Sequence, residues 1–192
     1  IRSDSTRVSV DAQNQALEYI GKEFGEKYVP EKPNIYKTKE NAQDAHEAIR
    51  PISIQRTPAS VMSSLSSDNF KLYKLIYERF LASQMSDAIY NNVNVDINAK
   101  NYGFKATGKT VEFLGYTAVY KNYAEKEDDP SKLPVMETGE KLKFNELSME
   151  QKFTKPPARY TEASLVKEME EKGIGRPATY AMTITTLDTR GY

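Results

Sequence analysis

The sequence predicts an α+β fold with three parts: a helical unit, a mainly antiparallel β segment and a terminal pair of helices. Apolar residues recur at helical spacing through the first part, and a period of two replaces that spacing near Tyr90. Two prolines at 156–157 then end the β pattern, and helical spacing returns. We therefore expect three domains, at residues 1–88, 89–160 and 161–192.

The first part is expected to hold four helices, at residues 10–24, 39–49, 58–65 and 70–89. Ser9 is a suitable N-cap for the first helix, and Gly25 is a suitable stop. Pro51 should end the second helix, because a residue that precedes proline, here Arg50, is disfavoured in helical geometry. Pro58 fits the first position of the third helix. This part is therefore predicted to be all-helical.

The middle part shows the alternation of half-buried strands. Val93, Val95 and Ile97 alternate with Asn and Asp, and a turn is expected near Lys100 and Asn101. Further strand pieces are expected at residues 102–104, 111–113, 116–120 and 142–147, with an acidic solvated loop at 125–133. The middle part is therefore predicted to be a small antiparallel β unit.

The last part is predicted to be a helix-turn-helix-like pair. Thr161 is an N-cap candidate for a helix over residues 162–172, which Gly173 should stop. Pro177 fits the first position of a second helix, which should run to about Thr189. Two helices joined by a short glycine-containing turn are typical of this motif.

Composition limits the possible functions. The 192 residues include 27 basic and 27 acidic side chains, so the formal charge of zero argues against attraction of the whole chain to nucleic acid, although local basic patches can survive. The absence of cysteine excludes disulfides and thiolate metal ligands, and a single histidine makes a zinc site made by the protein alone improbable. The sequence holds no signal-peptide pattern and no long apolar run, so we expect an intracellular protein without a membrane segment.

Arg2, Asp4 and Ser5 form the first candidate for a functional site. A carboxylate at Asp4 could orient the Arg2 guanidinium toward a phosphate oxygen. The alternative is local, because Asp and Ser are also good helix-capping residues. Spacing alone favours the capping interpretation.

His46 is the only histidine and lies within the predicted second helix, with Arg50 four residues further on. Its unperturbed pKa would allow a role in proton transfer or in binding phosphate. The alternatives are a hydrogen-bonded histidine in the core, and an Arg50 that interacts only with the helix dipole.

The turn at residues 173–180 could bind an anion. It combines glycines, the Arg176 guanidinium, the Thr179 hydroxyl and a helix start whose first amides lack partners. It lacks the lysine and glycine spacing of a nucleotide P-loop. The alternative is an ordinary turn between two helices, with Thr179 acting as part of the cap.

Four stretches, in this order, carry a family resemblance: residues 1–9 (Ile-Arg-Ser-Asp-Ser-Thr-Arg-Val-Ser), 42–51 (Ala-Gln-Asp-Ala-His-Glu-Ala-Ile-Arg-Pro), 81–85 (Leu-Ala-Ser-Gln-Met) and 160–192. Together they resemble the type IA DNA topoisomerases. The continuation Ser5-Thr6 favours the bacterial topoisomerase I branch over topoisomerase III. The resemblance covers the whole length of the chain.

The resemblance implies that the chain is a central fragment. In the family, the nucleophilic tyrosine stands directly before the hydrophobic residue that begins the first motif, here Ile1, so it would precede the chain. The acidic domain that holds Mg²⁺ is also expected outside the chain, and no metal site is expected within it. Residues 1–88 would be most of the helical domain that carries the tyrosine, 89–160 part of a β-rich hinge or arch, and 161–192 the start of a helical DNA-binding domain.

The resemblance also assigns roles to the candidate residues. Tyrosine would attack a phosphate of single-stranded DNA and form a 5′-phosphotyrosyl link. Arg2 would stabilise the charge that gathers on the phosphate, Asp4 would orient Arg2, and His46 would hydrogen-bond the scissile phosphate or its neighbours.

DNA binding would involve four more residues. Arg176 and Thr179 would hold a phosphate upstream of the cut, and Ser3 and Arg50 would also contact DNA. Ser3 stands where threonine is commoner in the family, which keeps the hydroxyl.

The resemblance therefore implies a cytoplasmic, nucleoid-associated enzyme that relaxes negatively supercoiled DNA without ATP, and we expect a monomer. The fragment alone is expected to be inactive. Two alternatives stay open for the isolated chain: a single-stranded DNA-binding module, or a structural hinge module without catalysis.

Overall fold

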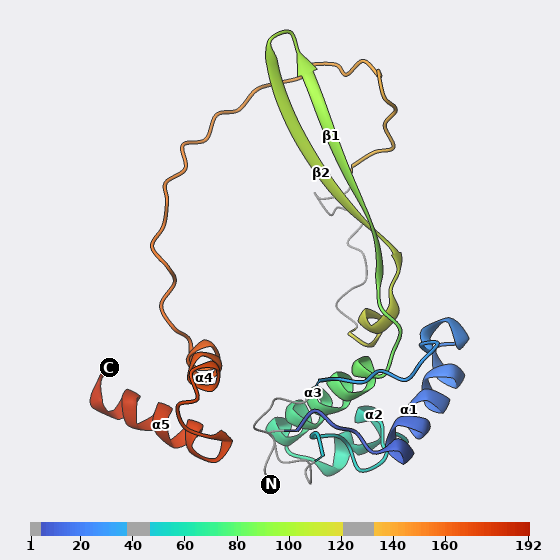
Figure 1. The fold of residues 1–192 in the computed structure, drawn as a ribbon, viewed down its shortest axis with the longest axis vertical. Helices are drawn as coiled ribbons and strands as arrows, with labels where there is room; N and C mark the ends of the chain where they lie inside the picture. The colour runs from blue at the N-terminus through green and yellow to red at the C-terminus, as the bar shows by residue number, and fades with distance from the viewer. Residues whose placement is uncertain (1–4, 38–46, 121–132) are drawn as a thin grey trace. The chain divides into compact units, whose positions relative to one another are not determined.

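The computed structural model describes residues 5–37, 47–120 and 133–192, and these divide into two compact units, within Ser5–Val135 and Met136–Tyr192 (Figure 1). The first unit holds three α-helices and a two-stranded sheet, and the second holds two α-helices. The predicted α+β class is confirmed. The division into three domains stays a prediction.

Three helices of the first unit begin at predicted caps or beside them. They are α1 (Val10–Glu23), α2 (Pro58–Val61) and α3 (Ser67–Ser83), with short 3₁₀ turns η1 (Glu26–Tyr28) and η2 (Met62–Ser64). The Ser9, Thr57 and Ser66 hydroxyls each accept a backbone N–H from the first turn of the helix that follows. Each cap satisfies an amide that the helix itself cannot pair.

The core of the first unit lies where α1 meets α3. Apolar residues that recur along α1 are buried against α3 and the segments around it: Ala12, Ala16, Ile20, Ile54, Tyr77, Phe80, Leu81, Ala82, Met85 and Val119. Ile20 is fully buried, which stabilises the fold by roughly 1.5–3 kcal/mol. Tyr77 also donates its hydroxyl to the Ile54 carbonyl at 2.8 Å, so this core fixes the loop before α2.

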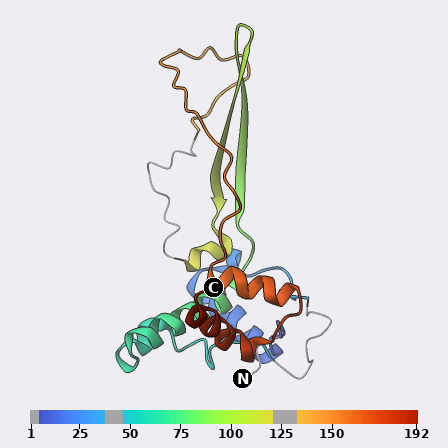
Figure 2. The same ribbon diagram turned by 90° about the vertical axis from the view of Figure 1, so that its left-hand side faces the viewer.

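The sheet is a long antiparallel hairpin of β1 (Ile89–Ala99) and β2 (Tyr102–Phe113), in which Val95 lies opposite Ala106. The predicted turn is present, and Lys100 adopts a left-handed conformation there (φ 55°). Figure 2 shows the hairpin extending away from the helices of the first unit, with only its base against them. At this base the rings of Tyr28 and Phe113 lie 4.8 Å apart between centroids.

Gly115 allows the base of the hairpin to close. It begins the 3₁₀ turn η3 (Gly115–Val119) with φ +48°, and a Cβ there would lie 2.3 Å from the Asp87 carbonyl oxygen. Such a contact is far inside van der Waals distance, and the conformation itself disfavours side chains. Only glycine fits this position.

The predicted helix over 70–89 was too long at its C-terminal end, because α3 stops at Ser83. Its last carbonyls are taken by side chains from the loop before α2, far away in sequence. The Asn34 amide donates to the carbonyls of Ser83 (3.0 Å) and Met85 (2.9 Å), and the Tyr36 hydroxyl donates to Ser83 (2.6 Å). These long-range hydrogen bonds pair the carbonyls at the end of α3, so the helix stops there and the chain continues toward β1.

The predicted helix over 39–49 was wrong at 47–49, and its remainder lies outside the described residues. Residues 47–50 have no regular secondary structure instead. The Ala48 N–H donates to the Arg7 carbonyl at 2.7 Å, so the backbone pairs with the N-terminal segment rather than within a helix.

Two predicted strands were also wrong. Residues 116–120 form the turn η3 and its cap, because Thr117 donates its hydroxyl to the Leu114 carbonyl at 2.6 Å and bends the chain. Residues 142–147 have no regular structure, and Phe144 is 75% exposed. Within the described residues no strand pairs with them, and alternation without a partner does not make a sheet.

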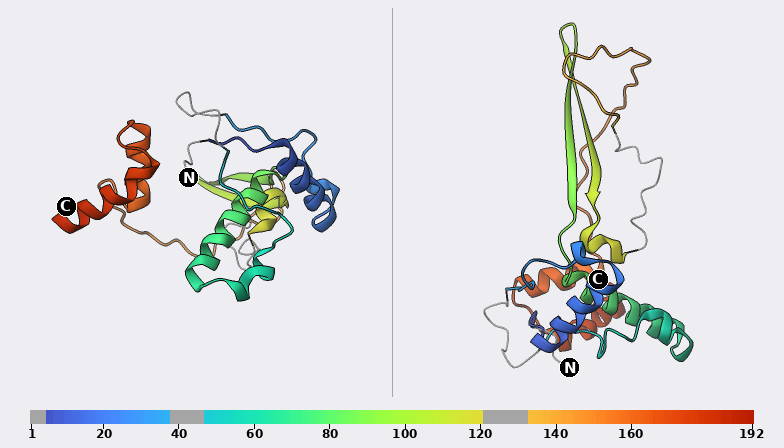
Figure 3. Two further views of the ribbon diagram at one scale, coloured as in Figure 1. Left: turned by 90° about the horizontal axis from the view of Figure 1, so that it is seen from below. Right: turned by 90° about the vertical axis from the view of Figure 1, so that its right-hand side faces the viewer.

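The second unit is the predicted helix pair, α4 (Glu162–Glu171) and α5 (Pro177–Arg190), which Figure 3 shows with the turn that joins them. Thr161 caps α4, and its hydroxyl accepts the Ser164 N–H at 3.2 Å. Met169 and Ile184 are the buried apolar side chains of the pair. None of the helices in the described part of the chain combines the length and apolar character needed to span a bilayer.

Candidate functional site

Three of the predicted site residues, Arg50, Arg176 and Thr179, are among the described residues. The other four lie outside them: Arg2, Ser3, Asp4 and His46. Their predicted roles therefore stay predictions. The structure instead describes the residues that directly follow them in the chain, from Ser5 and from Glu47 onward.

These two following segments, residues 5–9 and 47–51, lie side by side. The Ala48 N–H donates to the Arg7 carbonyl at 2.7 Å, and the Ser9 N–H donates to the Glu47 carboxylate at 2.8 Å. Ser5 is buried, and its hydroxyl accepts the Arg7 N–H at 3.1 Å. The fold therefore brings together segments 38 residues apart in sequence.

Glu47 and Arg50 form a bidentate ion pair within this arrangement. Arg50 donates from Nε to Glu47 Oε1 at 2.7 Å and from Nη2 to Oε2 at 3.2 Å, and its Nη1 donates to the Pro51 carbonyl at 3.1 Å. The Arg50 guanidinium, and beyond it the Ser9 N–H, lower the pKa of Glu47 to about 2. The carboxylate is therefore ionised at neutral pH.

A buried polar network anchors the same region to the end of α3. The Gln13 amide donates to Gln84 Oε1 and to the Asn34 carbonyl, each at 2.9 Å, and the Gln84 amide donates to Ser83 Oγ at 2.8 Å. Gln84 has no exposed surface. Sequence reasoning identified Gln84 only within the family-like stretch 81–85 and missed Asn34, which no local pattern distinguishes from an ordinary loop residue.

A cavity of about 340 Å³ with a mixed polar and apolar lining lies beside this network at the base of the hairpin. Its lining combines tyrosines with charged and amide side chains: Asn34, Tyr36, Arg79, Ala82, Ser83, Met85, Asp87, Tyr116 and Tyr120. Burial, and then the charge of Asp87, raise the pKa of Tyr36, so its hydroxyl stays protonated and donates to Ser83. Sequence reasoning did not find this cavity, because its residues come from three separate segments.

The turn between α4 and α5 brings Arg176 and Thr179 together, as predicted. The Thr179 hydroxyl accepts the Arg176 N–H and donates to the Arg176 carbonyl, each at 3.0 Å. Arg176 Nη1 donates to the Gly175 carbonyl at 2.6 Å. The observed bonds are those of a capped turn, with an exposed guanidinium held over the glycine backbone.

Gly175 is required in this turn. Its φ is +75°, and a Cβ there would lie 3.1 Å from the Thr179 hydroxyl oxygen and 3.3 Å from the Tyr180 ring. The glycine therefore lets the chain pass close to the start of α5.

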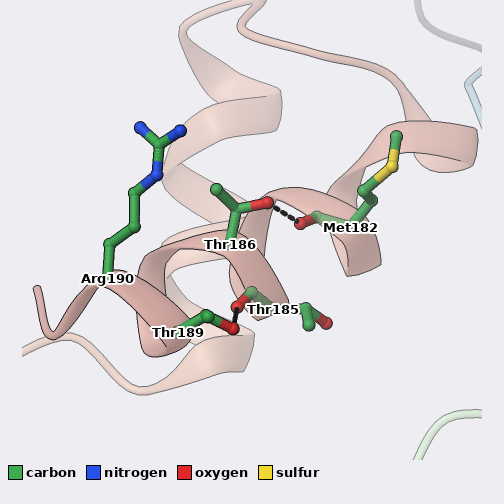
Figure 4. Close-up of a pocket in the computed structure, with 5 residues that line it drawn as sticks. All are labelled: Met182, Thr185, Thr186, Thr189 and Arg190. Carbon is green, nitrogen blue, oxygen red and sulfur yellow. Dashed lines mark hydrogen bonds between the residues drawn. The ribbon is translucent and has the colours of Figure 1, made fainter.

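A shallow cavity of about 290 Å³ lies along α5, lined by Met182, Thr185, Thr186, Thr189 and Arg190 (Figure 4). Thr186 and Thr189 donate their hydroxyls to carbonyls one turn earlier, at 2.8 Å to Met182 and 2.7 Å to Thr185. These hydroxyls are therefore already satisfied by their own helix.

The Mg²⁺ implied by the family resemblance has no fitting site in the described part of the chain. Among those residues, no group of three or more His, Cys, Asp or Glu side chains could hold a metal ion. No chemical step is assigned to a metal here.

Comparison with known proteins identifies the family. A family model described as DNA topoisomerase matches residues 1–192, the whole chain. Together with the α+β fold, this match shows that the chain belongs to the bacterial type IA DNA topoisomerases.

The relatives that match the chain carry the name DNA topoisomerase 1. The protein of Xylella fastidiosa is 48% identical over 199 residues and that of Haemophilus influenzae 48% over 192, with all of this chain covered in both. The structure of full-length topoisomerase I from Thermotoga maritima matches with a TM-score of 0.73 and 39% identity, over 100% of this chain and 30% of that one. The chain spans only 24% and 22% of the two named relatives.

Proposed function

We propose that this chain is the central part of a bacterial type IA DNA topoisomerase, an isomerase that relaxes negatively supercoiled DNA through transient cleavage of one strand. The observation that carries the proposal is the pairing of residues 5–9 with 47–51 in a chain of this family. These paired segments are the second halves of the family-like stretches 1–9 and 42–51, which supports a common site.

In the proposed reaction, a tyrosine from outside the chain attacks the phosphorus of a backbone phosphodiester. The new bond joins the tyrosine oxygen to phosphorus, and the bond to the 3′ oxygen breaks, which leaves a 5′-phosphotyrosyl link and a 3′ hydroxyl. After strand passage, the 3′ hydroxyl attacks the same phosphorus and releases the tyrosine. No net bond is gained or lost, so the reaction needs no ATP.

The roles of the site residues are part of the proposal. Arg2 stabilises the negative charge that accumulates on the phosphate, Asp4 orients Arg2, and His46 donates a hydrogen bond to the scissile phosphate or its neighbours. Ser3 and Arg50 contact the DNA backbone.

The turn between the second pair of helices supplies a further phosphate contact in this proposal. Arg176 is exposed, and among the described residues its Nη1 alone of the two terminal nitrogens is engaged, with the carbonyls of Gly175 and Gly173. The other N–H groups can therefore donate to a phosphate upstream of the cut, with Thr179 holding the helix start in place.

The proposal extends to the whole enzyme. It binds Mg²⁺ through a domain outside this chain, acts as a monomer on a single-stranded segment of duplex DNA, and works in the cytoplasm at the nucleoid. The chain on its own lacks the nucleophile and does not cleave DNA.

Relaxation of negatively supercoiled plasmid tests the proposal. The full-length protein that contains this chain should relax the plasmid without ATP, and the Arg2→Ala and His46→Ala variants should lose activity by roughly 10²-fold or more. The isolated chain of 192 residues should show none. A full-length protein without activity, or an isolated chain that relaxes DNA, would contradict the proposal.

The second candidate concerns the isolated chain alone, as a single-stranded DNA-binding or hinge module. Exposed Arg176 favours binding, whereas the zero net charge favours a structural role. Binding to a single-stranded oligonucleotide that weakens with rising salt would favour the DNA-binding module, because phosphate contacts release counterions.

A further inference from the structure

Glu47 has an arrangement that the proposed roles do not explain. It is an acidic residue in a region proposed to bind phosphates, where an uncompensated carboxylate would repel DNA. Its two oxygens nevertheless bind two different parts of the fold. Oε1 accepts the Ser9 N–H at 2.8 Å and the Arg50 Nε–H at 2.7 Å, and Oε2 accepts from Arg50 Nη2 at 3.2 Å.

The contact with Ser9 joins two segments that are distant in sequence. Ser9 is the N-cap of α1, so its backbone position is fixed by the helix as well as by Glu47. The Ala48 N–H adds a second hydrogen bond to the same N-terminal segment, at the Arg7 carbonyl. Two adjacent residues, Glu47 and Ala48, therefore set the register between residues 5–9 and 47–51.

The contact with Arg50 fixes the direction of a guanidinium. Arg50 uses Nε and one N–H of Nη2 on Glu47, and one N–H of Nη1 on the Pro51 carbonyl. Among the described residues, each terminal nitrogen therefore keeps a second N–H for another acceptor. A bidentate carboxylate holds the plane of an arginine that would otherwise sample several rotamers.

We propose that Glu47 is a positioning residue of the phosphate site: its carboxylate locks residues 47–51 to residues 5–9 and holds Arg50 in one orientation toward a backbone phosphate of DNA. This role rests on the proposed function. Glu47 touches neither DNA nor the nucleophile in this scheme, and it acts through Arg50 and through the register of the two segments. The low pKa of Glu47 supports the role, because the carboxylate stays charged throughout the working range of pH.

This role predicts that a substitution of Glu47 slows DNA cleavage without weakening DNA binding. In Glu47→Gln, the amide oxygen can still accept the Ser9 N–H, but the charged bidentate grip on Arg50 is lost. Removal of an acidic charge near bound DNA also favours binding. The variant should therefore bind DNA as tightly as the wild type or more tightly, and should cleave it about tenfold or more slowly, since misplaced groups reduce rates strongly.

The test uses the full-length protein that contains this chain. Three quantities are measured for the wild type and Glu47→Gln: the Kd for a single-stranded oligonucleotide, the single-turnover cleavage rate with protein in excess, and the Tm. Glu78→Gln is the matched control, because Glu78 is also partly exposed in the same unit and pairs with Lys74 at 3.7 Å. The control should leave all three quantities near their wild-type values.

The outcomes separate the role from the proposed function. A wild-type protein that cleaves no DNA would overturn the proposed function itself. If the wild type cleaves and Glu47→Gln cleaves as fast as Glu78→Gln, the positioning role is wrong while the function stands. Parallel losses in cleavage rate, DNA affinity and Tm would also overturn it, because they indicate a purely structural residue.

A second variant keeps the test decisive if Glu47→Gln does not fold. Arg50→Lys retains the positive charge and leaves the bond from Ser9 to Glu47 intact, but an ammonium cannot be held in a bidentate grip. It should bind DNA with little change in Kd and cleave it about tenfold more slowly. Cleavage by Arg50→Lys at the wild-type rate would overturn the proposal.

Discussion

Arg50 and Arg176 are both proposed to contact phosphate, and the two units of the molecule hold them in different ways. Arg50 is gripped by Glu47, whose carboxylate also binds the Ser9 backbone 38 residues away. Arg176 is held by the carbonyls of Gly173 and Gly175, within three residues of itself. The first arrangement needs the folded unit, whereas the second needs only a turn.

The same contrast extends to the rest of each unit. In the first unit, the side-chain bonds of Gln13, Asn34 and Tyr36 span 47 to 71 residues where they reach the end of α3. In the second unit, the side-chain bonds of the described residues join positions no more than four apart, as at Thr161, Arg176 and Thr183. Substitutions that break long-range contacts should therefore cost more stability than those that break local ones.

The largest effect is expected at the base of the hairpin. Gly115→Ala would place a Cβ 2.3 Å from the Asp87 carbonyl oxygen at a positive φ, so it should lower the free energy of unfolding by about 3 kcal/mol or more. Gly103→Ala, in the same hairpin but with no atom within 4 Å of the new Cβ, is the control and should have a small effect. Chemical denaturation of both variants measures the difference; equal stabilities would show that the close approach is not required.

A smaller loss is expected from the buried polar network. Gln84→Leu keeps most of the side-chain volume but removes the buried acceptor of the Gln13 amide and the amide that donates to the Ser83 hydroxyl, which should cost about 2 kcal/mol. Gln55→Leu is the matched control, because the Gln55 side chain is exposed. Denaturant midpoints compare the two, and a Gln84→Leu protein as stable as the control would mean that the network contributes nothing to holding α1 against α3.

The turn between α4 and α5 should lose less stability on substitution. Thr179→Val removes the hydroxyl that accepts the Arg176 N–H, and the loss of such a cap should destabilise α5 by about 1 kcal/mol. Thr185→Val is the control on the same helix, since its hydroxyl donates only to the Ala181 carbonyl. Helix content followed by circular dichroism during thermal unfolding distinguishes them. A larger loss for Thr179→Val than for Gln84→Leu would reverse the comparison between the units.

A loss no larger than that of the Thr179 cap, and confined to low pH, is expected from the protonation of Glu47. Its pKa is about 2 in the folded chain against 4.5 for the unperturbed group, so its stabilisation is complete above pH 4.5 and is lost as pH falls toward 2. The group is partly exposed, so the contribution is discounted to about 1 kcal/mol. The stability gap between the wild type and Glu47→Gln should therefore narrow between pH 5 and pH 2.5. A gap that stays constant over this interval would show that the ion pair does not stabilise the fold.

Local signals predicted the starts of the helices well. Ser9, Pro58, Thr161 and Pro177 stand where the structure begins its helices, because capping and the geometry of proline act within a few residues. The turn at Lys100 was predicted for the same reason.

Two of the errors share one cause, which is a contact between residues distant in sequence. The end of α3 at Ser83 depends on Asn34, and the non-helical backbone of Glu47 and Ala48 depends on Ser9 and Arg7. No periodicity within those segments contains this information. The strand expected at 142–147 was wrong for a different reason. Its residues alternate as in a strand, but no other strand among the described residues pairs with them.

For the candidate site, as for the fold, the sequence predicted the local contacts and missed the long-range ones. Sequence reasoning placed Arg176 beside Thr179, since both lie in one turn. It expected an arginine held by a carboxylate at Arg2 and Asp4, which lie outside the described residues, and missed the pair of this kind at Glu47 and Arg50. The opposite charges three positions apart were a signal, but they gave no indication that Glu47 also binds Ser9.

The sequence by itself determined the family, the α+β class, the helix starts and the Arg176 turn, because motifs, caps and turns are written in neighbouring residues. Only the tertiary structure decided where α3 ends, that residues 47–51 leave the helical pattern, and that Glu47 joins the two segments. These features depend on hydrogen bonds between residues dozens of positions apart, and such bonds form only once the core of α1 and α3 has brought those residues together.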